Sequence, residues 1–341
     1  MSEIEKKHRR TVLLMGAGLI VCILGSFTLG RYPVSLPELL GVLGHKLGLS
    51  VGPFWTSQVE AAVWNIRLPR VILSVLVGAC LAGAGGAYQG VFQNPMASPD
   101  ILGASAGAGF GAALAILLGA SGMGVTVGAF GCSLLTVALV FTISAHARGD
   151  RVLGLVLAGI MVSSLFQSGT SFLKLVADPS NQLPQITYWL MGSLAGAKWS
   201  DIGFVLLPML AGVVPLVLLR WQLNVITMGD DEARAMGVDP RRIRILVAVC
   251  STLATASAVS VSGMIGWVGL VIPHMMRRLV GSDYRFLMPA NLLGGGIFLL
   301  VVDNVSRNAA TAGIPIGILT AFIGAPFFLW LITGKGDHYA H

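Results

Sequence analysis

Residues 244–276 read RILVAVCSTLATASAVSVSGMIGWVGLVIPHMM, and Arg244 is the sole Lys, Arg, Asp or Glu among them. As one helix this stretch would extend about 50 Å, whereas the hydrocarbon core of a bilayer is roughly 30 Å thick. Gly263, Gly266 and Gly269 interrupt it at points where a helix can end. The stretch therefore predicts a span at 244–263 and a short return helix at 265–276.

The chain as a whole is also apolar. Of its 341 residues, 55% are hydrophobic and 11% charged, and the mean hydropathy is +0.81. Soluble domains carry about 25% charged residues, so this composition excludes a soluble enzyme and predicts an all-α, polytopic membrane protein that forms a single domain over 1–341. Further apolar runs long enough to cross a bilayer lie at 11–30, 71–93, 101–119, 123–145, 152–177, 202–219, 286–303 and 314–333, which brings the predicted total to ten.

The cationic residues predict the orientation of these ten spans. With both termini cytoplasmic, the inside loops carry the larger share of the 22 Lys and Arg residues, as the positive-inside rule requires. The inside set is Lys6, Lys7, Arg9, Arg10, Arg148, Arg151, Arg220, Arg234, Arg241, Arg242, Arg244, Arg277, Arg278, Arg285 and Lys335, and the outside set is Arg31, Lys46, Arg67, Arg70, Lys174, Lys198 and Arg307. One span over 244–276 would weaken this bias.

A weak internal repeat accompanies the ten spans. Basic residues followed by a small-residue span occur near 67, in RLPRVILSVLVGACLAGAGGAYQG, and again near 241, in RRIRILVAVCSTLATASAVSVSG. These spans are the second and seventh of ten, so the two copies are inverted in the membrane. Inverted repeats of about 1–200 and 201–341 are typical of transporters, although two Gly/Ala-rich spans can also look alike by chance.

No catalytic or metal-binding motif is present. The sequence contains no HExxH, GxSxG or Walker A motif, because GKG at 334–336 lacks the Gly-rich loop and the Ser/Thr. The four cysteines lie singly in apolar runs, and the net charge of +7 comes from short clusters between spans. We therefore expect no enzyme activity, no metal site and no nucleic-acid partner, and uphill transport would need a separate ATPase or an ion gradient.

Ionisable residues within the spans are scarce. Asp303 is the main exception, and Arg307 one turn later predicts a local ion pair. Because ion coupling needs intramembrane ionisable groups, a secondary transporter is disfavoured. A non-transporting membrane receptor is the other alternative, for which ten spans in an inverted repeat would be superfluous.

The longest inside loop, LNVITMGDDEARAMGVDPRRIR at 223–244, mixes acids and bases in an otherwise uncharged chain. Acids near the start of a short helix and Arg near its end stabilise that helix. The loop is either a docking element outside the lipid or an ordinary solvated loop.

Six ordered motifs together resemble the permeases of type II ABC importers for ferric siderophores, haem, cobalamin and related chelates, the FecCD-like family. They are RLPR at 67–70, QNPMASPDILG at 93–103, YWLMGSL at 188–194, LNVITMGDDEARAMGV at 223–238, GWVGLVIPHMMRRLVG at 266–281 and IPIGILTAFIGAPFFLWL at 314–331. The resemblance covers nearly the whole chain and implies a multi-pass permease of the cell (inner) membrane. It also implies a second permease copy as a homodimer, two cytoplasmic ATPases that hold ATP and Mg, and an external or periplasmic substrate-binding protein. No cofactor is expected on this chain itself.

The same resemblance implies roles for individual residues. The ATPase-coupling positions are Gly229, Asp231, Glu232, Ala233, Arg234 and Gly237; the inner-gate positions are Asn94 and Met96, with Met in place of the family's Leu; and the binding-protein docking positions are Arg67, Arg70 and Arg307. The family often has an acid just before the Ile-Pro-x-Gly of the last span, where this chain has Gly313.

The expected pathway is small and weakly polar, since a bulky ligand handed over by a binding protein needs a smooth path. Candidate lining residues within GIMVSSLFQSGTSF at 159–172 are Ser163, Ser164, Gln167, Ser168 and Ser171, for which helix packing is the alternative role. The small-residue stretch 103–111 is expected to allow tight packing in the homodimer. The expected cargo is a ferric siderophore, with haem, cobalamin or molybdate as alternatives.

Overall fold

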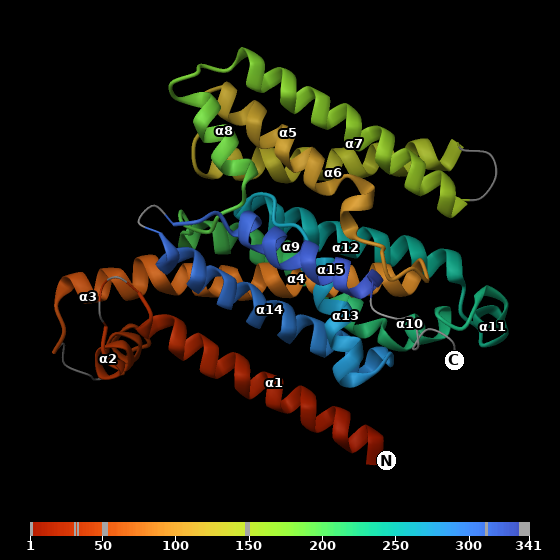
Figure 1. Ribbon diagram of the computed structural model, residues 1–341, viewed down its shortest axis with the longest axis horizontal. Helices are drawn as coiled ribbons and strands as arrows, with labels where there is room; N and C mark the ends of the chain where they lie inside the picture. Colours follow the sequence, from red (N-terminus) through yellow and green to blue (C-terminus); the bar gives the residue numbers. More distant parts are fainter. Residues whose placement is uncertain are drawn as a thin grey trace.

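The computed structural model describes residues 3–30, 32, 34–49, 54–146, 151–310 and 313–333, and within these ranges the chain contains helices but no strand (Figure 1). Long or membrane-crossing candidates are α1 (Glu3–Thr28), α4 (Leu68–Val91), α5 (Ala104–Leu117), α6 (Met123–His146), α7 (Arg151–Val176), α9 (Trp199–Leu218), α12 (Pro240–Ser262), α13 (Val268–Val280), α14 (Tyr284–Ala309) and α15 (Ile316–Thr333). Short elements are α2 (Leu36–Lys46), α3 (Ser57–Ala61), the π-helix η1 (Ala62–Arg67), the 3-10 helix η2 (Pro99–Leu102), α8 (Gln182–Leu190), α10 (Arg220–Ile226) and α11 (Asp230–Ala235). Arg31, Arg148 and Lys335 of the predicted charge pattern lie outside the described residues.

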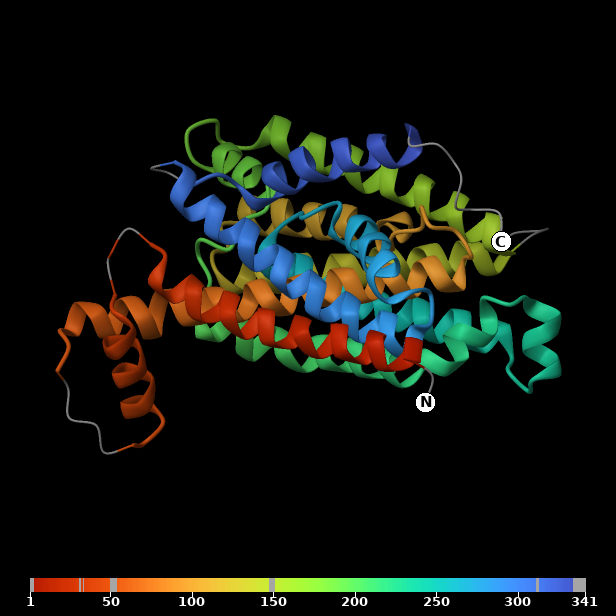
Figure 2. The same cartoon turned by 60° about the horizontal axis from the view of Figure 1, so that its bottom comes forward.

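Each predicted span corresponds to a helix. Seven helices of the described chain are long and apolar enough to cross a membrane, and the predicted spans 101–119, 265–276 and 314–333 correspond to the shorter helices α5, α13 and α15. The start of α1 and the end of α15 lie at the same end of the molecule (Figures 1 and 2). The protein is therefore a multi-pass membrane protein, and the count of ten spans and the cytoplasmic termini stay predictions.

The predicted break within 244–276 is confirmed. Helix α12 ends at Ser262, five residues are not helical, and α13 begins at Val268. Gly263 (φ +68°) and Trp267 (φ +71°) lie at the two ends of this break in conformations that no helix interior accepts. The α13–α14 turn then lies beside α10, because Asn224 Nδ2 donates to Asp283 Oδ1 at 2.7 Å.

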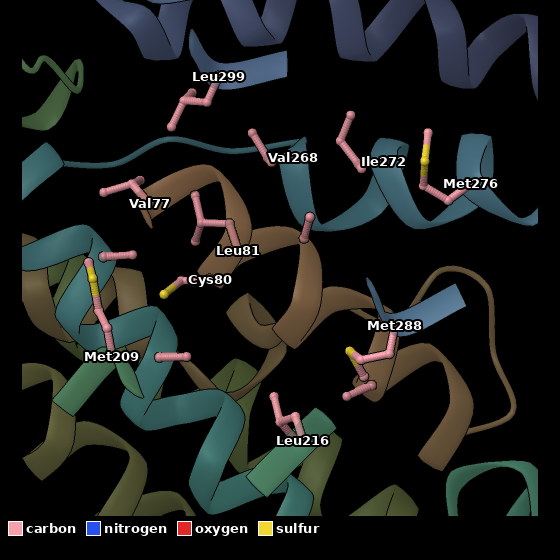
Figure 3. Packing of buried hydrophobic residues seen from close by; sticks show 14 of the residues in the cluster. Val77, Cys80, Leu81, Met209, Leu216, Val268, Ile272, Met276, Met288 and Leu299 are labelled. Atoms are coloured by element: carbon pink, nitrogen blue, oxygen red, sulfur yellow. The ribbon is translucent and has the colours of Figure 1, made fainter. Parts of the chain in front are cut away.

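Helices α4 and α12 form the centre of the bundle, and most of the residues in each are buried. Side chains of α4, α9, α13 and α14 meet in one apolar core, which includes Cys80, Met209, Ile272 and Leu299 (Figure 3). Helix α4 is followed by η2 and then by α5 of 14 residues, and α12 is followed by five non-helical residues and then by α13 of 13 residues. The inverted repeat and its boundaries stay predictions.

Helices α4 and α14 approach each other through glycine. A Cβ atom on Gly78 would lie 2.1 Å from the carbonyl oxygen of Gly295, and a Cβ on Gly295 would lie 2.2 Å from the carbonyl oxygen of Gly78. Such contact is possible only without side chains, and it lets apolar helices associate through van der Waals packing in lipid.

Two glycines of the stretch 103–111 pack on α6 within the protomer, and the predicted role of this stretch in a homodimer stays a prediction. A Cβ on Gly107 would lie 2.1 Å from Thr136 Oγ1, and one on Gly111 would lie 2.2 Å from the Gly128 carbonyl oxygen, both in α6. The composition of this stretch predicts close packing, but it carries no information about which helix is the neighbour.

Candidate functional site

The candidate coupling loop forms two short helices, α10 and α11, outside the long helices at the end where α12 begins (Figure 1). Val225, Ile226, Ala233 and Val238 form a small buried cluster of their own. Ala233 is thus fully buried and holds α11 in place, whereas Asp231 is 93% exposed at its side chain. Helix α11 therefore presents a charged surface supported by an apolar base.

Glycines bound α11 on both sides. Gly229 precedes the helix with φ +133°, and Gly237 follows it with φ +78°, a left-handed conformation that lets the chain leave the helix. Asp230, Asp231 and Glu232 occupy the first turn and Arg234 the last, which complements the helix dipole. Arg234 Nη1 also donates to Asp231 Oδ1 at 2.9 Å.

Asp230 and Arg244 fasten α11 to α12. Arg244 Nη1 donates to Asp230 Oδ2 at 2.9 Å, and Arg244 Nη2 lies 2.5 Å from Asp230 Oδ1. This paired hydrogen bond holds the pKa of the Asp230 carboxyl below its ordinary value. Sequence reasoning did not single out either residue for this role, because an acid at 230 looks like one more member of the acidic turn.

A second anchor joins α10 to the start of α14. Besides its bond to Asp283, Asn224 accepts a hydrogen bond from the Tyr284 amide at 2.7 Å. Partial burial would raise the pKa of Asp283, but hydrogen bonds from Arg285 and Asn224 hold it below its ordinary value. The candidate coupling loop is therefore fixed to both α12 and α14.

The candidate gate residues lie directly after α4, at the same end as α11. Asn94 Oδ1 accepts from the Met96 amide at 2.9 Å, and the Asn94 carbonyl accepts from the Ala97 amide at 3.0 Å. Met96 is 48% exposed in the single chain. These contacts hold the segment as a compact turn that presents Met96 outward.

The three candidate docking arginines gather at the opposite end of α4. They line one hollow of about 300 Å³ together with Tyr188, Ser193 and residues near Gly313. Arg67 is 6% exposed and donates to the carbonyls of Phe27 and Tyr32. The structure therefore brings the three arginines together. Their guanidinium groups are less exposed than their positions at helix ends alone would suggest.

Asp303 pairs with two of these arginines. Arg70 Nε lies 2.9 Å and Arg70 Nη2 2.8 Å from Asp303 Oδ1, and Arg307 Nε lies 3.4 Å from Oδ2. The predicted ion pair of Asp303 with Arg307 is confirmed, and Arg70, 233 positions away in the chain, completes it. The cluster of three arginines and one carboxylate keeps a net charge of two positive units.

The candidate pathway residues separate into two groups. Ser164, Gln167, Ser168 and Ser171 are exposed and recur at helical spacing, so they form one polar stripe on an outward face of α7. Ser163 is turned toward Gly103, since a Cβ on that glycine would lie 2.6 Å from Ser163 Oγ. Ser163 thus packs within the protomer, which is the alternative role foreseen for these residues.

No metal centre is formed within the described ranges, where no group of three His, Cys, Asp or Glu side chains could hold an ion. His274 is 8% exposed and faces Phe327, with ring centroids 6.3 Å apart. Its environment is that of a core residue.

Known proteins share both the sequence and this architecture. Over 319 residues the chain is 39% identical to the molybdate import system permease protein MolB of Haemophilus influenzae, covering 93% of this chain and 94% of MolB. It is 41% identical over 294 residues to the cobalamin import system permease protein BtuC of Halobacterium salinarum, covering 86% of this chain and 78% of BtuC. A metal-chelate type ABC transporter solved in an inward-facing conformation superposes with a TM-score of 0.84 at 36% identity, over 95% of this chain and 99% of that one. Residues 18–334 match the FecCD transport family, and the chain therefore belongs to this family of permease subunits of ABC importers.

Proposed function

We propose that this permease receives a ferric siderophore from an external binding protein at the arginine hollow and releases it past Met96 into the cytoplasm, powered by two ATPases. The observation that carries the proposal is the placement of the arginine hollow and the candidate gate at the two ends of α4. Arg70 stands near the start of this 24-residue helix and the candidate gate directly follows its end, about 36 Å away.

The coupling role is assigned to the exposed surface of α11. Asp231, Glu232 and Arg234 offer charges to an ATPase surface, while buried Ala233 and the flanking Gly229 and Gly237 maintain the shape of the helix. Charged residues on a firmly anchored helix can transmit a movement of the bound ATPase to the rest of the permease. A loop without such anchors would move by itself.

The test of this role is Glu232→Lys, with Glu3→Lys as the matched control. Both residues are exposed acids at the same end of the molecule, so a general charge effect would appear in both variants. Glu232→Lys is expected to lose ATPase subunits on co-purification and to abolish uptake in liposomes. Normal uptake and normal ATPase stoichiometry in this variant would refute the assignment.

The docking role rests on the excess positive charge of the arginine hollow. Arg suits this role because its planar fork binds a carboxylate through two hydrogen bonds. Since Asp303 already occupies part of Arg70 and Arg307, an acidic residue of the binding protein must enter the hollow and share these donors. Arg70→Glu is expected to weaken binding-protein association most at low salt, and unchanged affinity would leave the arginines as structural anchors.

The polar stripe of α7 supports a pathway between two copies of the permease. The Ser164 and Ser171 hydroxyls donate to carbonyls of their own helix, but among the described residues no hydrogen bond is formed by the exposed Gln167 amide, which is unfavourable against lipid. In a homodimer the stripe would face the second copy or the cargo. Ser168→Cys should become accessible to a water-soluble thiol reagent in the assembled importer, and complete protection by lipid would contradict this placement.

The cargo assignment rests on the charge of that stripe. It carries hydroxyl and amide groups but no cation, which suits a bulky, shielded chelate better than a bare oxyanion crossing a medium of low dielectric. Purified importer in liposomes, offered a ferric siderophore, haem, cobalamin and molybdate in parallel, identifies the cargo. ATP-independent uptake driven by an ion gradient would instead indicate a secondary transporter.

A further inference from the structure

Helix α4 ends with an unusual residue in the left-handed conformation. The Asn94 amide donates to the Gln89 carbonyl at 3.2 Å, and the Gln93 amide donates to the Gly90 carbonyl at 3.2 Å, which is the Schellman pattern of a helix end. Its left-handed position is normally taken by Gly, yet here Gln93 adopts φ +48°. A side chain in this conformation is strained relative to Gly, and such strain persists where other contacts enforce it.

The side chain of Gln93 provides that contact. Its Nε2 donates to the Ile226 carbonyl at 2.7 Å, at the end of α10, and Ile226 itself is fully buried in the apolar base of the coupling loop. Glycine would relieve the backbone but would remove this bond.

Arg244 forms a parallel connection. While its Nη atoms bind Asp230 of α11, its Nε lies 3.4 Å from the Val91 carbonyl, the last residue of α4. Residues 91 and 93 are thus held by α12 and α10 respectively, immediately before Asn94 and Met96. The candidate gate therefore continues directly from a segment held from two sides by the candidate coupling loop.

We propose that Gln93 and Arg244 are positioning residues that transmit movement of the coupling helices α10 and α11 to the gate segment at 94–97. The proposal rests on the proposed coupling role of 223–244 and adds the physical link by which that role reaches the pathway. When an ATPase displaces α11, Arg244 and the Ile226 carbonyl pull on the end of α4. The left-handed backbone at Gln93 is the point at which the turn can rotate.

The test compares Gln93→Gly with Gln93→Leu. If Gln93 had a purely structural role, the Gly variant should import as much cargo per ATP as the unchanged protein or more, because Gly is the favoured residue in this conformation. Transmission predicts that both variants assemble with the ATPases and hydrolyse ATP. They should nevertheless import about five- to tenfold less cargo per ATP, the lower end of the range that typical coupling energies span. The ATP-dependent change in thiol accessibility of a Met96→Cys reporter should shrink in parallel.

Arg244→Met tests the second connection, with Arg10→Met as the matched control, because Arg10 is an exposed arginine of α1 and lies outside the coupling helices. A normal ratio of import to hydrolysis in Gln93→Gly would overturn the proposal, and so would loss of ATPase binding in that variant. Failure of the coupling assignment itself is separately visible, since Glu232→Lys would then keep ATPase binding.

Discussion

Replacing Asp303 with Asn tests the arginine hollow most directly, because it removes one charge and keeps the shape. Asp303 is fully buried, and its carboxylate lies 2.8 Å from Arg70 Nη2 and 3.4 Å from Arg307 Nε. At an effective dielectric constant of about 20, these contacts correspond to Coulomb energies of roughly 6 and 5 kcal/mol before desolvation. Breaking a buried pair by removing one partner costs about 3–5 kcal/mol.

The lower end of that range applies to Asp303→Asn. Arg70 and Arg307 keep 13% and 12% of their side chains exposed at the hollow, so water relieves part of the penalty. A loss of about 3 kcal/mol should lower the melting temperature in nanodiscs by about 5 °C or more. At the same time the charge of the hollow rises from two to three positive units, so association of the binding protein should become faster and more sensitive to salt.

Stability and docking are thus expected to change in opposite directions, which a general folding defect cannot imitate. Thermal unfolding and surface-bound association kinetics at two salt concentrations measure the two effects. Asp178→Asn is the control for the change in net charge, because Asp178 is an exposed acid that does not line the hollow. An unaltered melting temperature would refute the buried-pair argument, and slower association would refute docking at the arginines.

Three further outcomes are expected. Gly78→Val should destabilise the protein severely, because its Cβ would lie 2.1 Å from the Gly295 carbonyl oxygen, whereas Gly131→Ala, with no atom within 4 Å, should be tolerated in the same thermal assay. Gly237→Asn should transport normally and Gly237→Val poorly, because the position has open space but φ +78°; equal uptake by both variants would argue against a backbone requirement. The pKa of Asp230 is lower in the folded protein than in the unfolded chain. The ionised carboxylate therefore stabilises the fold above the pKa of the unfolded chain, and this stability is lost as the pH falls through the pKa of the folded protein. Asp230→Asn should therefore flatten the pH dependence of the melting temperature below about pH 4, and an unchanged slope would contradict the pairing with Arg244.

Helix breaks and local ion pairs could be predicted from sequence because their causes are local. The length of 244–276 exceeds one bilayer crossing, and its glycines mark where it ends. The pairing of Asp303 with Arg307 follows from a spacing of one turn. Ion pairs between residues far apart in the chain do not follow from spacing, so the sequence indicates only a docking role for Arg70.

Contacts between distant segments could not be predicted in this way. The stretch 103–111 predicts close packing, but only the folded chain shows that α6 is its neighbour. Ser163 and Ser164 are adjacent in sequence and point to different surroundings, since neighbouring helix positions are rotated by about 100°. The left-handed conformation of Gln93 could not be predicted from the sequence, because the left-handed residue that ends a helix is expected to be Gly.

Helix α4 connects the proposed outer and inner events. Arg70 near its start is tied to Asp303 of α14, and the backbones of the two helices are in close contact at Gly78 and Gly295. Pairs of helices in such contact move together, so α4 and α14 are expected to shift as one body. The binding protein would then act on one end of this helix pair at the arginine hollow. The coupling loop would act on the other end through Gln93 and Asn224. Because coupling between two binding sites is reciprocal, occupancy of the ATPases by ATP should change the affinity for the binding protein, and Gln93→Gly should reduce that change in both directions.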